Sequence, residues 1–344
     1  MGSGTRIAID AMGGESGIRV TVPASLRALK SHPDLQLTLV GDSRQIETEL
    51  EACGEQLSAR LTLLHTEAVV RDDDKPTRVL RDRTESSMYL AVKLVEQGAV
   101  EACVSAGNTG ALLLSGRHLL KTIRGIEKPA ILATIPGANR NCYLLDVGAN
   151  VDCKAAQLVQ FAVMGSVLAE SLDGLRRARV ALLNIGVEDY KGSEQVKTAA
   201  ALLEEHAAIN YVGYVEGSAL FEGIADVVVC DGFVGNVTIK SSAGVVGVIN
   251  QALSEIAAAG SDSQQGALAQ ARLVSELQRR VDPSQFNGAS LLGLQGSIIK
   301  SHGNASAAGF QFAIERAIKE ARHNVPGLIA EKVAELVEIK AKSG

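Results

Sequence analysis

Short apolar runs that end in a polar residue and a glycine recur along the whole chain. Unbroken apolar runs of this kind are typical of strands that are buried on both faces of a parallel sheet. The pattern therefore predicts strands within residues 7–10, 37–42, 102–107, 143–148, 180–186, 227–232 and 297–303.

Helical segments separate these runs. Residues 84–97 carry Met88, Val92 and Val95 at helical spacing, and Gly98 is a plausible stop. Residues 153–172 predict a long, nearly apolar helix that is buried in a sheet layer or an interface. Strands that alternate with helices predict a doubly wound α/β fold with a mostly parallel sheet. Right-handed crossovers then place the strand C-termini at one edge, where ligands of open α/β sheets bind.

Residues 236 to about 280 form a different stretch, in which two helical patterns flank residues 257–266 and no strand is evident. We interpret it as a helical hairpin that projects from the α/β body and could dimerise, touch a membrane or clamp a partner. The predicted organisation is one α/β domain over residues 1–344, with the hairpin inserted at 236–285.

Composition excludes several classes of protein. The chain has 344 residues, of which 46% are hydrophobic and 3% aromatic, and 34 Lys and Arg against 39 Asp and Glu give a net charge of -5. A disordered chain is less apolar, and nucleic-acid binders are more basic or richer in aromatics, so no nucleic-acid partner is expected. No uninterrupted apolar run approaches the ~20 residues that cross a bilayer.

The five cysteines have no metal-binding spacing, and no signal peptide is evident. The odd number of cysteines and the absence of a signal peptide favour reduced thiols in the cytosol. Cys103 and Cys230 stand in apolar runs and are expected in the core.

The turn Ser105–Gly110 is glycine-rich, follows a predicted strand and leads into a helical segment. Such a turn presents free N–H groups and the positive end of the helix dipole, which suits an anion. Asn108 or Thr109 could equally be a plain N-cap. The motif is neither a Walker A loop nor a full dinucleotide fingerprint.

Four further loops follow predicted strands. Asp146 and Asn150 precede Asp152, which either binds a ligand or caps the following helix. Lys191 lies between a tyrosine and a glycine, and Asn236 ends a loop that contains two glycines. Lys300 and His302 end the last run, where the histidine is a candidate proton donor or a hydrogen-bonded residue of a turn.

This inventory suits a phosphate oxyanion and a carbonyl group, handled without a metal, a cofactor or a covalent intermediate. A serine hydrolase is disfavoured because the nucleophile-elbow motif is absent from the sequence. Carboxylates such as Asp10 and Asp146 are too few in one place to argue a Mg²⁺ site or a glycosidase.

Several long motifs resemble the phosphate acyltransferases of bacterial phospholipid synthesis, the PlsX family. They are Ile9-Asp-Ala-Met-Gly-Gly14, Cys103-Val-Ser-Ala-Gly-Asn-Thr-Gly-Ala111, Leu145-Asp-Val-Gly-Ala-Asn-Val-Asp-Cys153, Leu183-Asn-Ile-Gly-Val-Glu-Asp-Tyr-Lys-Gly192, Val229-Cys-Asp-Gly-Phe-Val-Gly-Asn-Val237 and Ile299-Lys-Ser-His-Gly303. The resemblance covers about residues 6–322. Glu15 and the loop 285–290 depart from the family pattern, which leaves the role of that loop open.

The resemblance implies a fold of the isopropylmalate dehydrogenase and phosphotransacetylase type. It also implies the reaction of a long-chain acyl-ACP with inorganic phosphate to give acyl phosphate and free ACP.

A homodimer is expected, in the cytoplasm with a transient peripheral contact at the inner face of the membrane. A membrane glycerol-3-phosphate acyltransferase would be a functional contact. The alternatives are an NAD(P)-dependent decarboxylating dehydrogenase on the same fold and a non-catalytic ACP-binding protein.

For this reaction we predict catalytic roles for Lys300, His302, Lys191 and Asn236. Substrate binding is predicted for Asp10, Gly13, Gly14, Gly107, Asn108, Thr109, Gly110, Asp146, Asn150, Asn184, Asp231 and Gly232. Which loop binds phosphate and which binds the pantetheine arm stays open. Acidic ACP needs a basic patch. The candidates are Lys75, Arg78, Arg81 and Arg83 or, on the hairpin, Arg272, Arg279 and Arg280.

Overall fold

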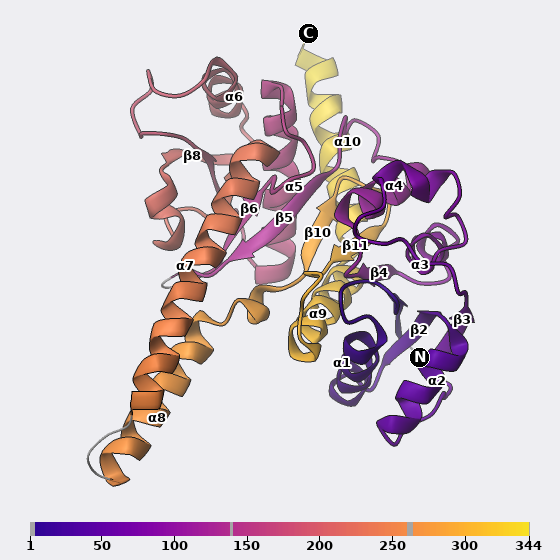
Figure 1. The fold of residues 1–344 in the computed structure, drawn as a ribbon. Helices are drawn as coiled ribbons and strands as arrows, with labels where there is room; N and C mark the ends of the chain where they lie inside the picture. Colours follow the sequence, from indigo (N-terminus) through magenta and orange to yellow (C-terminus); the bar gives the residue numbers. More distant parts are fainter. Residues whose placement is uncertain (1–3, 138–139, 260–263, 344) are drawn as a thin grey trace.

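A single mixed sheet runs through the computed structural model, which describes residues 4–137, 140–259 and 264–343 (Figure 1). Its eleven strands follow the order β3-β2-β1-β4-β11-β10-β5-β6-β9-β7-β8. The strands are β1 (Thr5–Asp10), β2 (Leu35–Gly41), β3 (Leu61–His65), β4 (Ala102–Ser105), β5 (Ala130–Ile135), β6 (Cys142–Leu145), β7 (Arg179–Leu183), β8 (Asn210–Val215), β9 (Val227–Val229), β10 (Ala289–Leu292) and β11 (Ser297–Lys300).

Ten α-helices of the described residues surround this sheet or extend from it. They are α1 (Ile18–Ser31), α2 (Ser43–Ala52), α3 (Ser87–Glu96), α4 (Thr109–Leu119), α5 (Ala155–Asp173), α6 (Glu194–Glu204), α7 (Gly232–Ala259), α8 (Gln264–Val281), α9 (Ala307–His323) and α10 (Val325–Ser343). Short 3-10 helices lie at Pro76–Leu80, Gly217–Phe221 and Pro283–Phe286. The α/β class with a mostly parallel sheet is therefore confirmed.

The two halves of the sheet run in opposite directions. Strands β3, β2, β1, β4 and β11 are mutually parallel, and so are β6, β9, β7 and β8. Antiparallel pairing of β11 with β10, of β10 with β5 and of β5 with β6 reverses the direction between the halves. The expectation that all strand C-termini share one edge is wrong, because it assumed parallel crossovers throughout.

All seven strands predicted from the apolar runs are present. The runs did not reveal β3, β5, β8 and β10. Strands β3 and β8 form the two edges of the sheet, where most of their residues are partly exposed and polar residues or a glycine break the apolar run. Strands β5 and β10 are apolar but antiparallel to their neighbours, and a βα turn with a polar residue and a glycine does not follow them.

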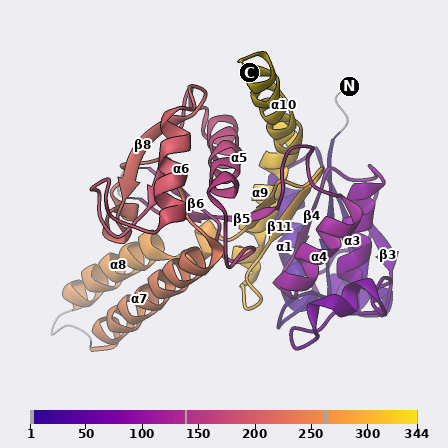
Figure 2. The same ribbon diagram turned by 90° about the horizontal axis from the view of Figure 1, so that it is seen from above.

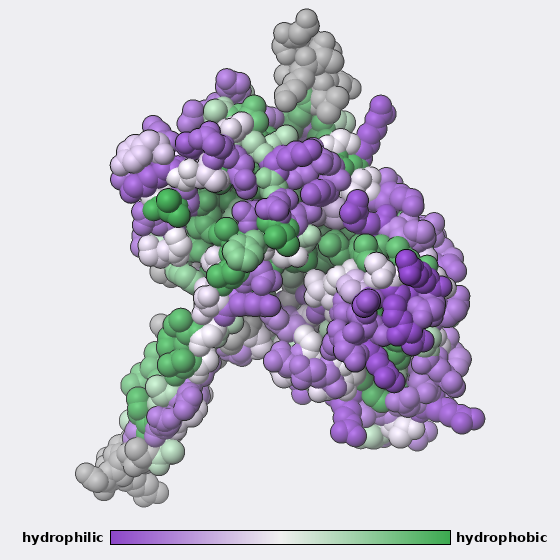
Figure 3. Space-filling model, turned by 45° about the horizontal axis from the view of Figure 1, so that its top comes forward, coloured by the Kyte–Doolittle hydropathy of each residue, from purple (hydrophilic) through white to green (hydrophobic). Residues whose placement is uncertain are grey.

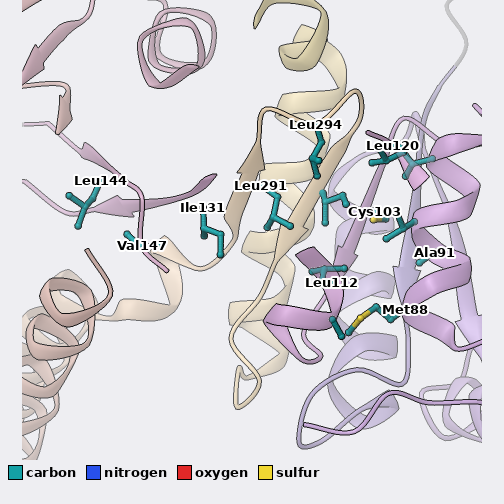
Figure 4. Packing of buried hydrophobic residues seen from close by; sticks show 14 of the residues in the cluster. Met88, Ala91, Cys103, Leu112, Leu120, Ile131, Leu144, Val147, Leu291 and Leu294 are labelled. Atoms are coloured by element: carbon teal, nitrogen blue, oxygen red, sulfur yellow. The ribbon is translucent and has the colours of Figure 1, made fainter. Parts of the chain in front are cut away.

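Side chains alternate between two faces along each strand, and this alternation divides the core. Ala8, Cys103 and Leu144 belong to a cluster on one face that crosses both halves of the sheet. Figure 4 shows this cluster running from α3 and α4 across β10 and β5 to β6. On the opposite face, α1 and α9 cover the first half, and α5 with α10 covers the second (Figure 2).

Helix α5 is the long apolar helix predicted from residues 153–172, and it is mostly buried. Lys154 precedes it, and its N–H donates to Oε1 of Gln157 at 2.9 Å. Of the two alternatives for Asp152, capping of this helix is therefore wrong, since the helix begins two residues later than the cap would require.

Helices α7 and α8 form the predicted hairpin, which extends away from the sheet (Figures 1 and 2). By length and composition alone, two described helices could cross a membrane, Ala155–Asp173 and Gly232–Ala258. The first has 61% of its apolar window buried inside the protein, whereas the second has only 11%. The sequence contained no uninterrupted run of this length because polar residues such as Asn236 and Lys240 interrupt the apolar face of α7.

Candidate active site

A cavity of about 510 Å³ lies where α4, β5, the end of β11 and α7 meet. Its polar lining consists of Thr109, Thr134, Asn236, Lys240, Ser242, Lys300, Ser301 and His302. Apolar side chains that include Leu113, Ile131, Ile135, Val147, Ile239, Val246, Phe221 and Phe286 form most of the remaining wall. The cavity therefore joins cationic and hydrogen-bonding groups to an apolar surface.

The loop after β6 reaches this cavity although its strand runs opposite to β4 and β11. Strand β6 is short and ends at Leu145, which pairs with Leu132 in the middle of β5. Val147 and Gly148 consequently lie beside Ile131 and line the same cavity. The antiparallel strand β5 thus brings the ends of both halves together.

Lys300 stands at the end of β11 with its ammonium group partly buried. Its Nζ donates to the carbonyl of Ala106 at 3.1 Å and to the carbonyl of Ser301. Burial lowers the pKa of Lys300 from 10.5 to about 8, although the carboxylates of Asp72 and Asp10 oppose this shift. Most of the Lys300 population is therefore still cationic at pH 7.

His302 follows at the exposed rim of the cavity. Its backbone N–H donates to Oδ1 of Asn287 at 3.0 Å, which fixes the turn. Desolvation of the ring by neighbouring atoms and the positive charge of Lys300 lower the pKa of His302 below its usual value. The ring is therefore mainly neutral at pH 7 and can donate one N–H as a hydrogen bond.

Helix α4 points its first turn toward the cavity, because Thr109 and Gly110 line it. Asn108 is the N-cap of this helix, as one of the two sequence interpretations held, and its Oδ1 accepts from the N–H of Ala111 at 3.0 Å. The N–H of Leu112 bonds to the Asn108 carbonyl. Helix geometry leaves the N–H groups of Thr109 and Gly110 as the first-turn donors for an anion.

Asp10 lies beneath this turn and is only 1% exposed. Its Oδ2 accepts from Oγ of Ser105 at 2.6 Å, and the same Oγ accepts from the N–H of Gly107 at 3.1 Å. A Cβ on Gly13 would approach this Oδ2 to 2.6 Å, which requires glycine there. The structure therefore places Asp10 and Gly13 behind the anion turn and not on the cavity wall.

Gly14 has a φ of 87°, and a Cβ there would lie 2.8 Å from the carbonyl oxygen of Gly303. The N–H of Glu15 donates to the same carbonyl at 2.8 Å. The loop after β1 is thus fixed against the loop that carries Lys300 and His302.

Asp146 organises the loop after β6. Its carboxylate accepts from the N–H groups of Ile131, Gly148, Ala149 and Asn150 and from the side-chain amide of Asn150, at 2.7–3.2 Å. Burial raises the pKa of Asp146, whereas these hydrogen bonds favour its charged form. Asn150 also donates to the carbonyl of Pro129 at 2.8 Å. The side chains of Asp146 and Asn150 are therefore hydrogen-bonded to other groups of the protein.

The loop on the β9–α7 side also holds two of the predicted residues. Oδ1 of Asp231 accepts from the N–H of Val234 at 2.8 Å in the first turn of α7. A Cβ on Gly232 would lie 2.6 Å from the carbonyl oxygen of Asn150. One turn on, Asn236 donates to the carbonyl of Val147 at 3.2 Å and lines the cavity.

Lys191 and Asn184 lie on the loop after β7 and do not line this cavity in the described part of the chain. Lys191 pairs with Glu188 at 2.8 Å, and Nδ2 of Asn184 donates to the Lys191 carbonyl at 3.2 Å. Of the four predicted catalytic residues, the structure brings Lys300, His302 and Asn236 together, and their roles stay predictions.

Sequence reasoning missed Lys240, a second cation that lines the cavity. It stands four residues after Asn236 on α7, so the two side chains share one helix face. That spacing was available in the sequence, but only the packing of α7 against β6 identifies the face that matters.

In the first basic patch considered for ACP, Arg78 is already held in ion pairs. Arg78 pairs with Asp74 at 2.5 Å and with Asp82 at 2.7 Å. Lys75 and Arg81 are exposed. On the hairpin Arg272 is exposed, whereas the side chains of residues 279 and 280 lie outside the described part of the chain.

The chain is similar to known proteins both in sequence and in structure. The sequence model of a family described as fatty acid synthesis protein matches residues 5–328. A phosphate acyltransferase of Alkalilimnicola ehrlichii is 48% identical over 97% of both chains. Another, from Pseudomonas savastanoi pv. phaseolicola, is 51% identical over 93% of this chain and 94% of its own.

Solved structures with the same fold include a phosphotransacetylase from Streptococcus pyogenes, with a TM-score of 0.61 and 17% identity over 94% of this chain and 95% of that one. A branched-chain phosphotransacylase from Enterococcus faecalis has a TM-score of 0.54 and 15% identity over 92% and 99% of the two chains. These likenesses confirm the phosphotransacetylase type of fold.

Proposed function

This chain belongs to the family of fatty acid synthesis proteins and is an acyltransferase that uses phosphate as a substrate; from that premise we propose that its acyl donor is a long-chain acyl-ACP. The products would be an acyl phosphate, which serves phospholipid synthesis, and free ACP.

The cavity is the observation that carries this proposal. Its volume of about 510 Å³ falls within the ~300–1,000 Å³ typical of ligand pockets. Phosphate needs the cationic and N–H-rich end near Lys300 and α4, and a fatty acyl chain needs the apolar wall. A dehydrogenase substrate such as a short hydroxyacid would leave that wall without a partner.

The mechanism follows from this placement. The N–H groups at the start of α4 and the ammonium of Lys300 hold phosphate, and one phosphate oxygen attacks the thioester carbonyl. A C–O bond forms, and the tetrahedral oxyanion receives hydrogen bonds from Asn236 and His302. The C–S bond then breaks and its electron pair leaves with the sulfur of ACP. Positioning supplies up to ~7–11 kcal/mol of the barrier reduction and oxyanion donors about 3–4.

ACP docking requires local positive charge, because the whole chain carries a net charge of -5. We favour the Arg272 side of the hairpin over the 75–83 segment, since Arg78 of that segment is already paired with Asp74 and Asp82. Reversing Arg272 to Glu should raise the KM for acyl-ACP and weaken its salt dependence. If the KM of this variant is unchanged and the KM of the wild type does not depend on salt, ACP does not dock through charge.

The hairpin also supports a homodimer. Val245, Val248 and Ile256 are 51–69% exposed on α7, and Figure 3 shows apolar residues along the hairpin.

We place the protein in the cytoplasm, with transient peripheral contact at the inner face of the membrane. Acyl phosphate is a reactive mixed anhydride, so contact with a membrane glycerol-3-phosphate acyltransferase would limit its hydrolysis. Light scattering and flotation with phosphatidylglycerol vesicles test the dimer and the membrane contact separately.

The decisive experiment incubates the protein with palmitoyl-ACP and phosphate and traps acyl phosphate as the hydroxamate. We expect product with palmitoyl-ACP, and a loss of at least tenfold in kcat/KM for Lys300→Ala and for His302→Ala. Palmitoyl-CoA in a parallel reaction tests whether the carrier protein is recognised. Equal rates with both donors would contradict the ACP preference, and no hydroxamate with either would refute the proposed donor class.

A further inference from the structure

We infer that Asp10 is a positioning residue, whose buried carboxyl group holds the anion turn after β4 and the ammonium of Lys300 in place for phosphate. This inference rests on the proposed function for its kinetic readout only. It replaces the idea that Asp10 itself contacts substrate.

Burial excludes direct contact. Asp10 is 1% exposed, and its side chain does not line the cavity in the described part of the chain. A carboxylate beside a phosphate would also repel it. Any effect of Asp10 on phosphate must therefore pass through neighbouring groups.

The first connection runs through Ser105. Asp10 accepts the Ser105 hydroxyl proton at 2.6 Å, which orients the Ser105 oxygen to accept the N–H of Gly107 at 3.1 Å. Gly107 immediately precedes the N-cap of α4. The carboxylate thereby fixes the direction of the turn that presents the first N–H groups of this helix.

The second connection is electrostatic. Lys300 Nζ donates to the carbonyl of Ala106, in the turn that Asp10 supports, and the charges of Asp10 and Lys300 favour each other's ionised form. Oδ1 of Asp10 is buried with no hydrogen-bond partner among the described residues. The negative charge of this oxygen is therefore not engaged in a hydrogen bond and is available to interact with the ammonium group of Lys300.

Other titratable groups also face Lys300. Asp72, from the segment before the first 3-10 helix, supports its charge. His302 on the following turn is affected by the Lys300 charge, and Lys240 on α7 lines the same cavity. Burial raises the pKa of Asp10 itself, whereas Ser105, Ser87 and the Met12 N–H favour its carboxylate form. Among these groups, only the two carboxylates raise the pKa of Lys300.

The experiment measures kcat/KM for phosphate between pH 6 and 9.5 in wild type and Asp10→Asn. In the wild type, deprotonation of Lys300 should lower kcat/KM for phosphate above about pH 8. This decline is the alkaline limb of the pH profile. Removing one of the two opposing charges should move this limb to lower pH. At pH 8 the protonated fraction of Lys300 is then smaller than in the wild type, and the KM for phosphate should be higher.

Two controls separate positioning from damage. Asp226→Asn removes another buried carboxylate, which pairs with Arg179 at 2.9 Å on the second half of the sheet. It should lower the melting temperature without moving the limb. Lys300→Arg should lack the limb with or without Asp10→Asn, because the guanidinium stays protonated. Calorimetric titration with inorganic phosphate provides the same pH profile where a variant does not turn over.

An unmoved limb in Asp10→Asn, or an equal movement in Asp226→Asn, overturns the inference. Wild type that binds phosphate with this pH profile but forms no acyl phosphate refutes the proposed donor instead. The two failures are therefore distinguishable.

Discussion

Replacing Lys300 by methionine should change how the stability of the protein depends on pH. The pKa of Lys300 falls from 10.5 in the unfolded chain to about 8 in the folded state, chiefly because its ammonium group is desolvated. Between these two values the unfolded chain binds the proton and the folded protein does not. Stability contributed by position 300 therefore rises with pH through this window and is constant below about pH 8.

One pKa unit corresponds to about 1.4 kcal/mol, so the full window is worth about 3 kcal/mol. From pH 8 to 9.5 the wild type should gain about 2 kcal/mol relative to Lys300→Met. The buried cysteines also titrate in alkaline solution, since burial raises the pKa of Cys142 to about 12 and that of Cys153 to about 11. They are present in both proteins, so they cancel in the difference.

Urea unfolding followed by circular dichroism at pH 7, 8, 9 and 9.5 measures this difference for the two proteins. Lys197→Met is a matched control, because it removes a lysine that is paired at the surface with Glu194. A difference between wild type and Lys300→Met that stays constant over this range would refute the account of a buried, partly desolvated lysine.

Three further predictions concern two buried carboxylates and the cysteines. Asp146→Ala leaves several loop N–H groups without an acceptor and should cost at least about 3 kcal/mol, measured as a fall in the urea midpoint. Glu320→Ala should cost about 3–5 kcal/mol because Arg316, whose side chain is 11% exposed, loses its partner at 2.9 Å; replacing both residues by methionine and leucine should recover part of that loss. Only Cys53 is exposed among the five cysteines, so native protein should show one fast thiol with a disulfide reagent, and Cys53→Ser should show none.

The sequence predicted the parallel strands because such strands are buried on both faces and leave an unbroken apolar run. It did not predict β5 and β10, whose runs are equally apolar but lack the polar turn that introduces a helix. These two strands reverse the sheet, so the expectation of one common edge failed with them.

The site was predicted in part for a related reason. Lys300, His302 and Asn236 follow strands, and the structure brings them to one cavity. Asp10, Asp146 and Asn150 also follow strands, but their side chains are turned inward and bond to protein groups. Position after a strand cannot distinguish a side chain that faces a ligand from one that supports the loop.

The sequence by itself determined the fold class, the family and the set of loops from which a site could be built. Local patterns decide these properties, because the burial of a strand and the type of turn after it depend on residues that are close together in the sequence. Only the tertiary structure decided that β6 ends beside the middle of β5, that Lys240 shares the cavity with Lys300, and that Asp10 lies beneath it. Each of these depends on how segments distant in the chain pack together, which fixes both the neighbours of a charged group and its access to water.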